Sequence, residues 1–319
     1  MKIPTVTSSG RNNIDVISKS KWSYVDIVQA VLILLLINFF AAIISPDFNS
    51  SFNDAKIFSY PIFSLIVGIG SLLIIYYLMK STHIPTTYIV VLTGMCFVFF
   101  FVVNFSQFSD TNQNQTIIGV KDLTTIFFLG LSTIIITASF TIGKHKTSFG
   151  NLGFVKPLWV QDFKLAIVTW IISILIVGVW TSLLIKFGSN GIIEKLIPPD
   201  SARELFNATG ENVFVMLIIV SVLAPISEEL FFRGFMFSGL IKLFRGEKKI
   251  IIASIISSIV FAVSHVDVGA YFVAFVLGMS FTFLYWRTKT IWVPIFAHSL
   301  HNTTALLLVI LSNKLGWLY

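Results

Sequence analysis

The feature that most constrains this chain is a series of long apolar runs that recurs from residue 24 to residue 312. A helix needs about 20 consecutive apolar residues to cross a bilayer, and most of the runs approach that length. We expect them at residues 24–45, 58–79, 84–104, 124–142, 163–186, 212–241, 249–266, 270–286 and 291–312. Pro225 and several charges fall in the sixth run, which leaves eight and nine crossings both open. The predicted fold class is an all-α, polytopic membrane helix bundle with about eight or nine transmembrane segments.

The composition excludes an ordinary soluble domain. The 319 residues are 55% hydrophobic and 12% charged, with a mean hydropathy of +0.88, whereas about a quarter of the residues of a soluble protein are charged. The net charge of +7 comes from lysines and arginines that lie mainly in the short connections between the runs. That distribution is typical of membrane orientation rather than of nucleic-acid binding. The expected partner is therefore the lipid bilayer, with no nucleic acid.

The basic connections fall on one side of the membrane if the runs simply alternate in direction. They are the N-terminal stretch, the stretch with Lys144, Lys146 and Lys156, and the stretches LFRGEKK and WRTK. A basic excess marks the cytoplasmic side. We therefore expect an integral membrane protein with a cytoplasmic N-terminus, and the bacterial cytoplasmic membrane as its location.

Ionisable residues are sparse in the predicted spans before residue 200 and accumulate after it. The last hundred residues place five such groups within or at the edges of spans, namely Glu228, Glu229, Arg233, His265 and His298. Each costs on the order of 3 kcal/mol to insert, so such groups usually pair inside a bundle and mark a functional site. The sequence thus predicts two parts, a polar tail with about five helices at 1–209 and a catalytic helical core at 210–319.

The spacing of these residues predicts how they meet. Glu229 and Arg233 are four residues apart and share a helix face, which favours a salt bridge, whereas Glu228 projects about 100° away. Phe261 and His265 have the same spacing, as do His298 and Asn302. The pattern leaves one acid paired and the other free for chemistry.

A free carboxylate beside histidines and an amide can hydrolyse a peptide bond with water as the nucleophile. Glu228 would act as the general base, and His265 would position or polarise the water. His298 and Asn302 would stabilise the oxyanion that develops on the carbonyl. Alternatively, Glu228, His265 and His298 could hold a divalent metal such as zinc, because two histidines and a carboxylate are an ordinary catalytic ligand set. The residues alone leave both versions open.

Three ordered motifs resemble those of a known family. EELFFR at 228–233, FAVSH at 261–265 and HSLHN at 298–302 match the patterns EExxxR, FxxxH and HxxxN of the CAAX protease and bacteriocin-processing family, also called the Abi family. The resemblance covers roughly residues 210–312, about a third of the chain. It implies an intramembrane endopeptidase; members trim prenylated proteins or are linked to bacteriocin immunity and peptide maturation.

The resemblance also implies roles for the motif residues. Glu228 is the activating carboxylate, Glu229 and Arg233 support it, and His265 assists the water. His298 acts on the intermediate together with the motif asparagine, Asn302. The family is often labelled as metalloproteases, although a metal-free glutamate mechanism is also proposed for it, and this chain inherits both versions.

Two other function classes compete with the peptidase. The motifs could belong to a non-catalytic scaffold or bacteriocin self-immunity protein, or the buried charges could line the ion path of a transporter, although no inverted repeat is evident. His301, His83 and His145 are read as ordinary structural histidines.

One geometrical conflict is visible in the sequence. Full-length alternating spans would place His265 near the outer face and His298 about two turns from the inner face, too far apart to share a site. We therefore expect a helix that is tilted or penetrates only partly, with the distortion near the DVG stretch after His265.

Overall fold

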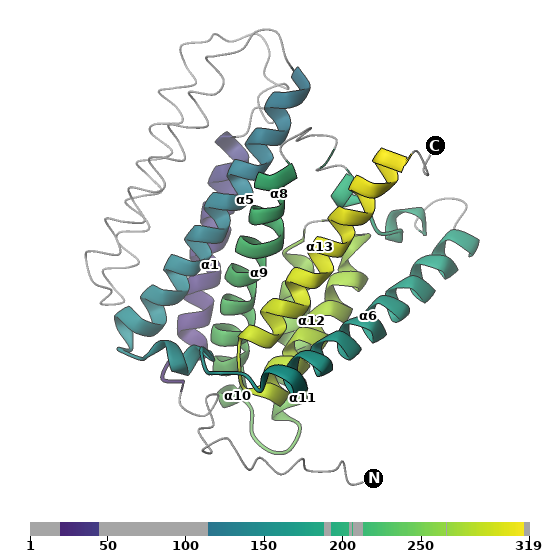
Figure 1. Cartoon of the computed structure of the whole chain (residues 1–319). Helices are drawn as coiled ribbons and strands as arrows, with labels where there is room; N and C mark the ends of the chain where they lie inside the picture. Colours follow the sequence, from purple (N-terminus) through teal and green to yellow (C-terminus); the bar gives the residue numbers. More distant parts are fainter. Residues whose placement is uncertain are drawn as a thin grey trace, which may run out of the picture.

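The computed structural model describes residues 20–44, 114–187, 193–203, 206, 213–265 and 267–315, and no strand occurs within these ranges. In chain order the helices are α1 (Tyr24–Ile44), α5 (Asn114–Ala138), η2 (Ser139–Lys144), η3 (Phe149–Leu152), α6 (Trp159–Phe187), η4 (Glu194–Leu196), α8 (Val213–Ile218), η5 (Ile219–Leu223), α9 (Ala224–Glu229), η6 (Leu230–Phe237), α10 (Ser238–Leu243), α11 (Lys249–Val263), α12 (Ala270–Thr288) and α13 (Trp292–Leu315). The long helices form one bundle, with α6 leaning away from it toward its C-terminal end (Figure 1). The predicted all-α membrane helix bundle is confirmed.

Four helices of the described chain are long and apolar enough to cross a membrane, and three shorter apolar helices accompany them. The four are Trp159–Phe187, Val213–Leu243, Ala270–Thr288 and Trp292–Leu315; the shorter ones are Tyr24–Leu35, Leu129–Lys144 and Lys249–Val263. The predicted runs at 58–79 and 84–104 lie outside the described residues, so the number of eight or nine crossings stays a prediction.

Pro225 does not interrupt the span Val213–Leu243. The segments α8, η5, α9, η6 and α10 follow one another without a break, and η5 and η6 are π-helical. Proline lacks an N–H group and its ring clashes with the preceding turn. The wider π turn of η5, which ends directly before α9, relieves that clash and lets the helix continue through the motif acids.

The length of α11 bears on the conflict seen in the sequence. This helix begins at Lys249, ends at Val263 and has 15 residues, or about 22 Å at 1.5 Å per residue, which is shorter than a bilayer core of about 30 Å. His265, which is exposed, follows two residues after its end. A helix of this length fits the partial penetration expected from the sequence, which stays a prediction.

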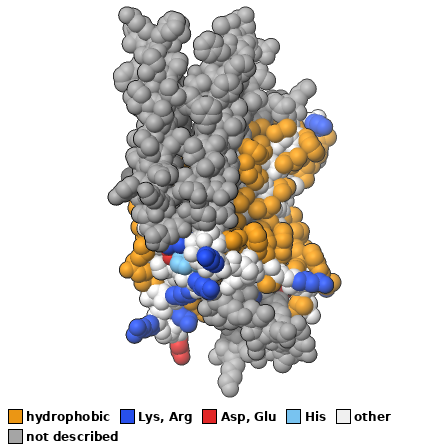
Figure 2. Space-filling view, turned by 90° about the vertical axis from the view of Figure 1, so that its left-hand side faces the viewer, with side chains coloured by type: hydrophobic (Ala, Val, Ile, Leu, Met, Phe, Trp, Pro, Cys, Tyr) orange, Lys and Arg blue, Asp and Glu red, His pale blue; other side chains and the backbone are white. Residues whose placement is uncertain are grey.

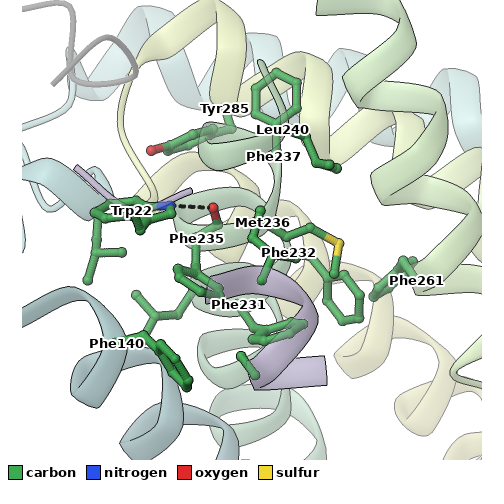
Figure 3. Packing of buried hydrophobic residues seen from close by; sticks show 14 of the residues in the cluster. Trp22, Phe140, Phe231, Phe232, Phe235, Met236, Phe237, Leu240, Phe261 and Tyr285 are labelled. Carbon is green, nitrogen blue, oxygen red and sulfur yellow. Dashed lines mark hydrogen bonds between the residues drawn. The ribbon is translucent and has the colours of Figure 1, made fainter. Parts of the chain in front are cut away.

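A cluster of buried residues, many of them aromatic, joins the segment before α1 to the helix that carries the motif acids (Figure 3). The Trp22 Nε1 atom donates a hydrogen bond of 2.8 Å to the carbonyl oxygen of Phe235, and the two rings lie 5.7 Å apart. Phe140 packs against the other side of Phe235 at 6.2 Å. Gly239 makes this approach possible, because a Cβ atom there would lie 2.6 Å from a methyl carbon of Ile27. Residues before α1 therefore brace the helix that carries the motif acids.

The end of the bundle where the chain enters α1 is polar and basic. Asp26, which is buried, accepts bonds from Lys144 Nζ at 2.7 Å and from the ring of His145 at 3.0 Å. The ammonium group of Lys242 donates to the backbone carbonyl of Ser20. Lysine and arginine side chains gather at this end, below the hydrophobic surface (Figure 2). This end matches the basic connections of the sequence.

Candidate active site

Three buried side chains form the inner part of the site, and we call Glu229, Arg233 and His298 the buried triad. The Oε1 atom of Glu229 accepts hydrogen bonds from Arg233 Nη1 at 2.9 Å and from His298 Nδ1 at 2.8 Å. Their side-chain exposures are 0%, 1% and 6%, respectively. The predicted pairing of Glu229 with Arg233 is confirmed, and the paired acid also fixes the imidazole of the third motif.

The guanidinium group of Arg233 is enclosed on all sides that the structure describes. Its Nη2 atom donates to the carbonyl oxygen of Gly278 at 3.2 Å. Its central carbon lies 4.5 Å from the ring centre of Phe261 and 5.3 Å from that of Phe281. Aromatic faces attract a cation most strongly where water is absent. Arg233 therefore links α12 to the continuous helix α9–η6 that carries the motif acids, which we call the motif helix. Its positive charge is surrounded by aromatic rings.

Not every polar atom of the buried triad is satisfied. Glu229 Oε2 and Arg233 Nε have no hydrogen-bond partner in the described part of the chain. Breaking a buried ion pair by removing one partner costs about 3 to 5 kcal/mol, whereas an intact pair adds little net stability. The buried triad therefore adds little net stability to the fold. What it provides is a fixed position for the Glu229 carboxylate and the His298 ring.

Glu228 and His265, which we call the open pair, form the outer part of the site. The Glu228 side chain is 32% exposed, but its Oε2 atom is buried and has no hydrogen-bond partner among the described residues. That atom lies 3.9 Å from His298 Nε2. This separation is too long for a direct hydrogen bond and short enough for one water molecule to bond to both atoms.

His265 stands at the exposed end of α11, with its ring edge-on to Phe261 at 4.8 Å between centres. Phe261 in turn lies 6.0 Å from the His298 ring, so one aromatic side chain contacts both motif histidines. The spacing of FxxxH thus has a physical meaning here. The Phe261 ring contacts Arg233 as well as the two imidazoles.

Hydrogen bonds fix the tautomers of both histidines. The Nδ1 atom of His265 lies 2.8 Å from the carbonyl oxygen of Phe261, and a carbonyl can only accept. The Nδ1 atom of His298 lies 2.8 Å from a carboxylate that is already paired with Arg233. Each neutral ring must therefore carry its proton on Nδ1 and present a lone pair on Nε2. The two histidines can accept hydrogen bonds from water, but neither can donate one from Nε2 while neutral.

Asn302 is held by the helix that carries Pro225. Its Nδ2 atom donates to the carbonyl oxygen of Val220 at 2.8 Å. In η5 the N–H of Ala224 bonds to the carbonyl of Ile219, five residues back. The next bond of this π pattern would join Pro225 to Val220, but proline has no N–H. The asparagine replaces that missing donor with one of its two Nδ2 hydrogens.

The three proposed metal ligands do not form a metal site in this arrangement. Within the described residues, no group of three or more His, Cys, Asp or Glu side chains is placed to hold a metal ion. The Nδ1 contacts of His265 with Phe261 and of His298 with Glu229 leave both Nε2 atoms available as ligands, so they do not argue against a metal. The metal alternative stays a prediction.

Two important neighbours were missed by the sequence patterns. Phe281 on α12 stacks on the His298 ring at 4.9 Å with an interplanar angle of 21°, and Gly278 supplies the carbonyl that accepts from Arg233. Nothing distinguishes Phe281 among 32 phenylalanines. Gly278 carries a weak signal, because a glycine inside a helix usually marks a close approach; a Cβ there would lie 3.2 Å from Phe261 Cδ1.

Comparisons with known proteins agree with the motifs. Residues 210–304 match the model of a family described as type II CAAX prenyl endopeptidase Rce1-like. The chain is 40% identical over 93 residues to "Putative membrane peptidase YdiL" of Bacillus subtilis (strain 168), which covers 29% of this chain and 36% of that protein. It is 32% identical over 108 residues to "Membrane-embedded CAAX protease MroQ" of Staphylococcus aureus (strain USA300), covering 33% and 43%.

The extent of these matches is limited. The chain spans less than half the length of either of these curated relatives. No solved structure matches. All motif residues from Glu228 to Asn302 fall inside the matched range. The C-terminal third of the chain is therefore similar to the Rce1-like CAAX prenyl endopeptidases, which confirms the resemblance that the three motifs predicted.

Proposed function

We propose that this protein is an intramembrane endopeptidase that hydrolyses a peptide bond of a peptide or membrane-anchored substrate with an activated water. The observation that carries the proposal is that two adjacent acids, Glu228 and Glu229, have different surroundings. Glu229 is buried and bonded to Arg233 and His298, whereas Glu228 is 32% exposed with an oxygen that no described group binds. A structural charge cluster would have no use for the second, unpaired carboxylate.

The water would bind between the two parts of the site. It donates one hydrogen to Glu228 Oε2 and the other to an imidazole lone pair, either His298 Nε2 at 3.9 Å from that oxygen or His265 Nε2. These acceptors orient the oxygen lone pair toward the substrate carbonyl. Because both rings are held by their Nδ1 atoms, the acceptors are in place before substrate arrives.

In the proposed hydrolysis, both proton transfers take place between the water, Glu228, His298 and the leaving amine. As the water oxygen bonds to the carbonyl carbon, one water proton passes to the Glu228 carboxylate and the carbonyl π electrons move onto its oxygen. The second Nδ2 hydrogen of Asn302 can bond to this oxyanion. When the C–N bond breaks, the amine leaves with the proton from Glu228, either directly or through His298 Nε2. The oxyanion role predicted for His298 itself would require the doubly protonated ring.

The comparisons support a protease in the membrane. The matched family is described as a CAAX prenyl endopeptidase, and one relative is named as a membrane-embedded CAAX protease. We therefore propose a peptide or membrane-associated protein substrate and include prenylated peptides among the candidates. Residues 210–319 would form the catalytic core, and residues 1–209 the N-terminal polar tail and about five transmembrane helices.

We further propose that the N-terminus faces the cytoplasm of a bacterial cell. The basic groups Lys144 and Lys242 lie at the end of the bundle where α1 begins, and a basic excess favours the cytoplasmic side. Both relatives come from bacteria. This orientation would be tested with a membrane-impermeant label directed to either end of the bundle in intact cells.

The test is cleavage of a quenched peptide library, with prenylated and unmodified members, by the purified protein in detergent. Glu228→Gln keeps the size of the side chain and removes the base, so wild type should cleave a subset of peptides and the variant none. Ser299→Ala on α13 is the control and should cleave like wild type. A wild-type protein that binds peptides without cleaving them would favour the scaffold reading, and chelator sensitivity would favour the metal version.

A further inference from the structure

His301 is an ionisable side chain of α13 that the three motifs do not use. It lies three residues after His298 on α13, about 4.5 Å further along the axis and about 60° around it. Its Nδ1 atom is buried and has no hydrogen-bond partner among the described residues. His298 and His301 are three residues apart on α13, so their side chains are neighbours on the helix surface.

The helix geometry shows where this side chain points. Relative to His298, Asn302 lies about 40° to one side and bonds to Val220, whereas Ala297 lies about 100° to the other side. Ala297 is fully buried in a cluster with residues of α12, including Phe281. His301 projects between the direction of Ala297 and that of His298. The His301 side chain thus points between two neighbours of α13, namely α12 and the helix that carries Glu229.

The exposed fraction of the side chains increases along this face of α13 toward its C-terminal end. Ala297 is 0% exposed, His301 is half-buried, and Leu308, about 20° away from His301 two turns further along, is 63% exposed. On the opposite flank, Leu306 is 1% exposed. His301 therefore stands between the buried part of α13 and its exposed part.

The proposed mechanism assigns only one hydrogen-bond donor to the oxyanion, the second amide hydrogen of Asn302. The neutral rings of His265 and His298 present lone pairs on Nε2, because their Nδ1 protons are committed to Phe261 and Glu229. Glu228 is an acceptor while ionised. An oxyanion needs hydrogen-bond donors, and Asn302 has already given one of its two amide hydrogens to Val220. A neutral imidazole without fixed partners always has one N–H to offer.

We propose that His301 is a catalytic residue that donates a hydrogen bond to the oxyanion formed when the activated water attacks the substrate carbonyl. This inference rests on the proposed peptidase function and adds a donor to it. In the step, the carbonyl π electrons move onto oxygen, the water proton goes to Glu228, and the His301 N–H stays on its ring while bonding to the oxyanion. The same N–H is retained when the intermediate collapses.

The experiment compares three substitutions in the full-length protein in detergent, using the peptide that wild type cleaves best. His301→Phe keeps a flat ring but has no N–H, His301→Gln keeps an N–H at the reach of Nε2, and Ser299→Ala, about 160° away on the same helix, is the control. We expect His301→Phe to lose about 100-fold or more in kcat with little change in KM. His301→Gln should recover at least a tenth of the wild-type kcat, and all three should unfold at the wild-type temperature.

Each other outcome overturns the proposal. If His301→Phe keeps its kcat within about twofold while Glu228→Gln is inactive, the peptidase stands and His301 is not its donor. If both His301 variants lose kcat equally, or both unfold at lower temperature, the role is structural. If wild type cleaves nothing under conditions where it is folded, the peptidase function fails and this inference fails with it.

Discussion

Two adjacent carboxylates differ in almost every physical respect, and the difference identifies the working part of the site. Glu229 is completely buried, bonds to two partners and sits beside an arginine wrapped in aromatic rings. Glu228 is partly exposed, has an oxygen that no described group binds, and faces an imidazole lone pair at 3.9 Å. One residue of helical rotation, about 100°, separates the two roles.

The comparison extends to the buried triad and the open pair as wholes. The buried triad holds its groups in one arrangement through the bonds of Glu229 to Arg233 and His298. The open pair offers a carboxylate and an imidazole lone pair to whatever enters. Catalysis needs both, because a base is effective only if a rigid surround fixes its position. Changes in the buried triad should therefore act on stability first, and changes in the open pair on activity alone.

The largest stability effect is expected from breaking the buried triad. Glu229→Ala leaves the Arg233 guanidinium buried without its carboxylate and should destabilise the protein by about 3 to 5 kcal/mol. Thermal unfolding in detergent, followed by tryptophan fluorescence, measures the loss. The double change Glu229→Leu with Arg233→Leu removes both charges and should recover much of that stability while remaining inactive. An unchanged unfolding temperature in Glu229→Ala would contradict the assignment.

A smaller effect is expected from the asparagine that replaces the missing proline donor. Asn302→Leu leaves the Val220 carbonyl without its bond and should cost about 1 to 3 kcal/mol. In a Pro225→Ala background the new N–H can satisfy that carbonyl, so the same substitution should cost measurably less. A double-mutant cycle on unfolding temperature gives the coupling. Additive effects would show that Asn302 does not compensate for the proline.

The smallest effect concerns the packing that brings α12 to the arginine. Gly278→Ala places a Cβ 3.1 Å from Ser258 Cβ and 3.2 Å from Phe261, and should destabilise by about 1 to 2 kcal/mol through overpacking. It should also lower activity, because Phe261 contacts both motif histidines. Gly178→Ala on α6 is the matched control, since its Cβ would meet nothing within 4 Å. Equal behaviour of the two variants would show that this contact is unimportant.

The sequence predicted the fold where one rule dominated. Long apolar runs require helices in a bilayer, and the described helices fall close to the predicted runs, such as α6 at Trp159–Phe187 for the run 163–186. Helical spacing also predicted the Glu229–Arg233 pair, because residues four apart share a face. Both inferences depend only on local geometry.

The sequence did not predict what depends on contacts between distant segments. Nothing in its pattern indicated that Glu229 would bond to His298, 69 residues away, or that Phe281 would stack on that histidine. Pro225 suggested an interruption because the compensating π turn and the donor from Asn302 come from tertiary structure. The spacing of residues in the sequence predicts which of them share a helix face. Which helix faces come into contact depends on the tertiary packing.

One paired measurement tests the central claim most directly. Glu228→Gln and Glu229→Gln are the same chemical change at adjacent positions, and each variant would be assayed for both peptide cleavage and thermal unfolding. We expect Glu228→Gln to lose at least about 10²- to 10⁴-fold in cleavage rate with an unfolding temperature like that of wild type. Glu229→Gln should unfold at a clearly lower temperature. The account is contradicted if Glu228→Gln still cleaves at the wild-type rate, or if the two variants lose stability equally.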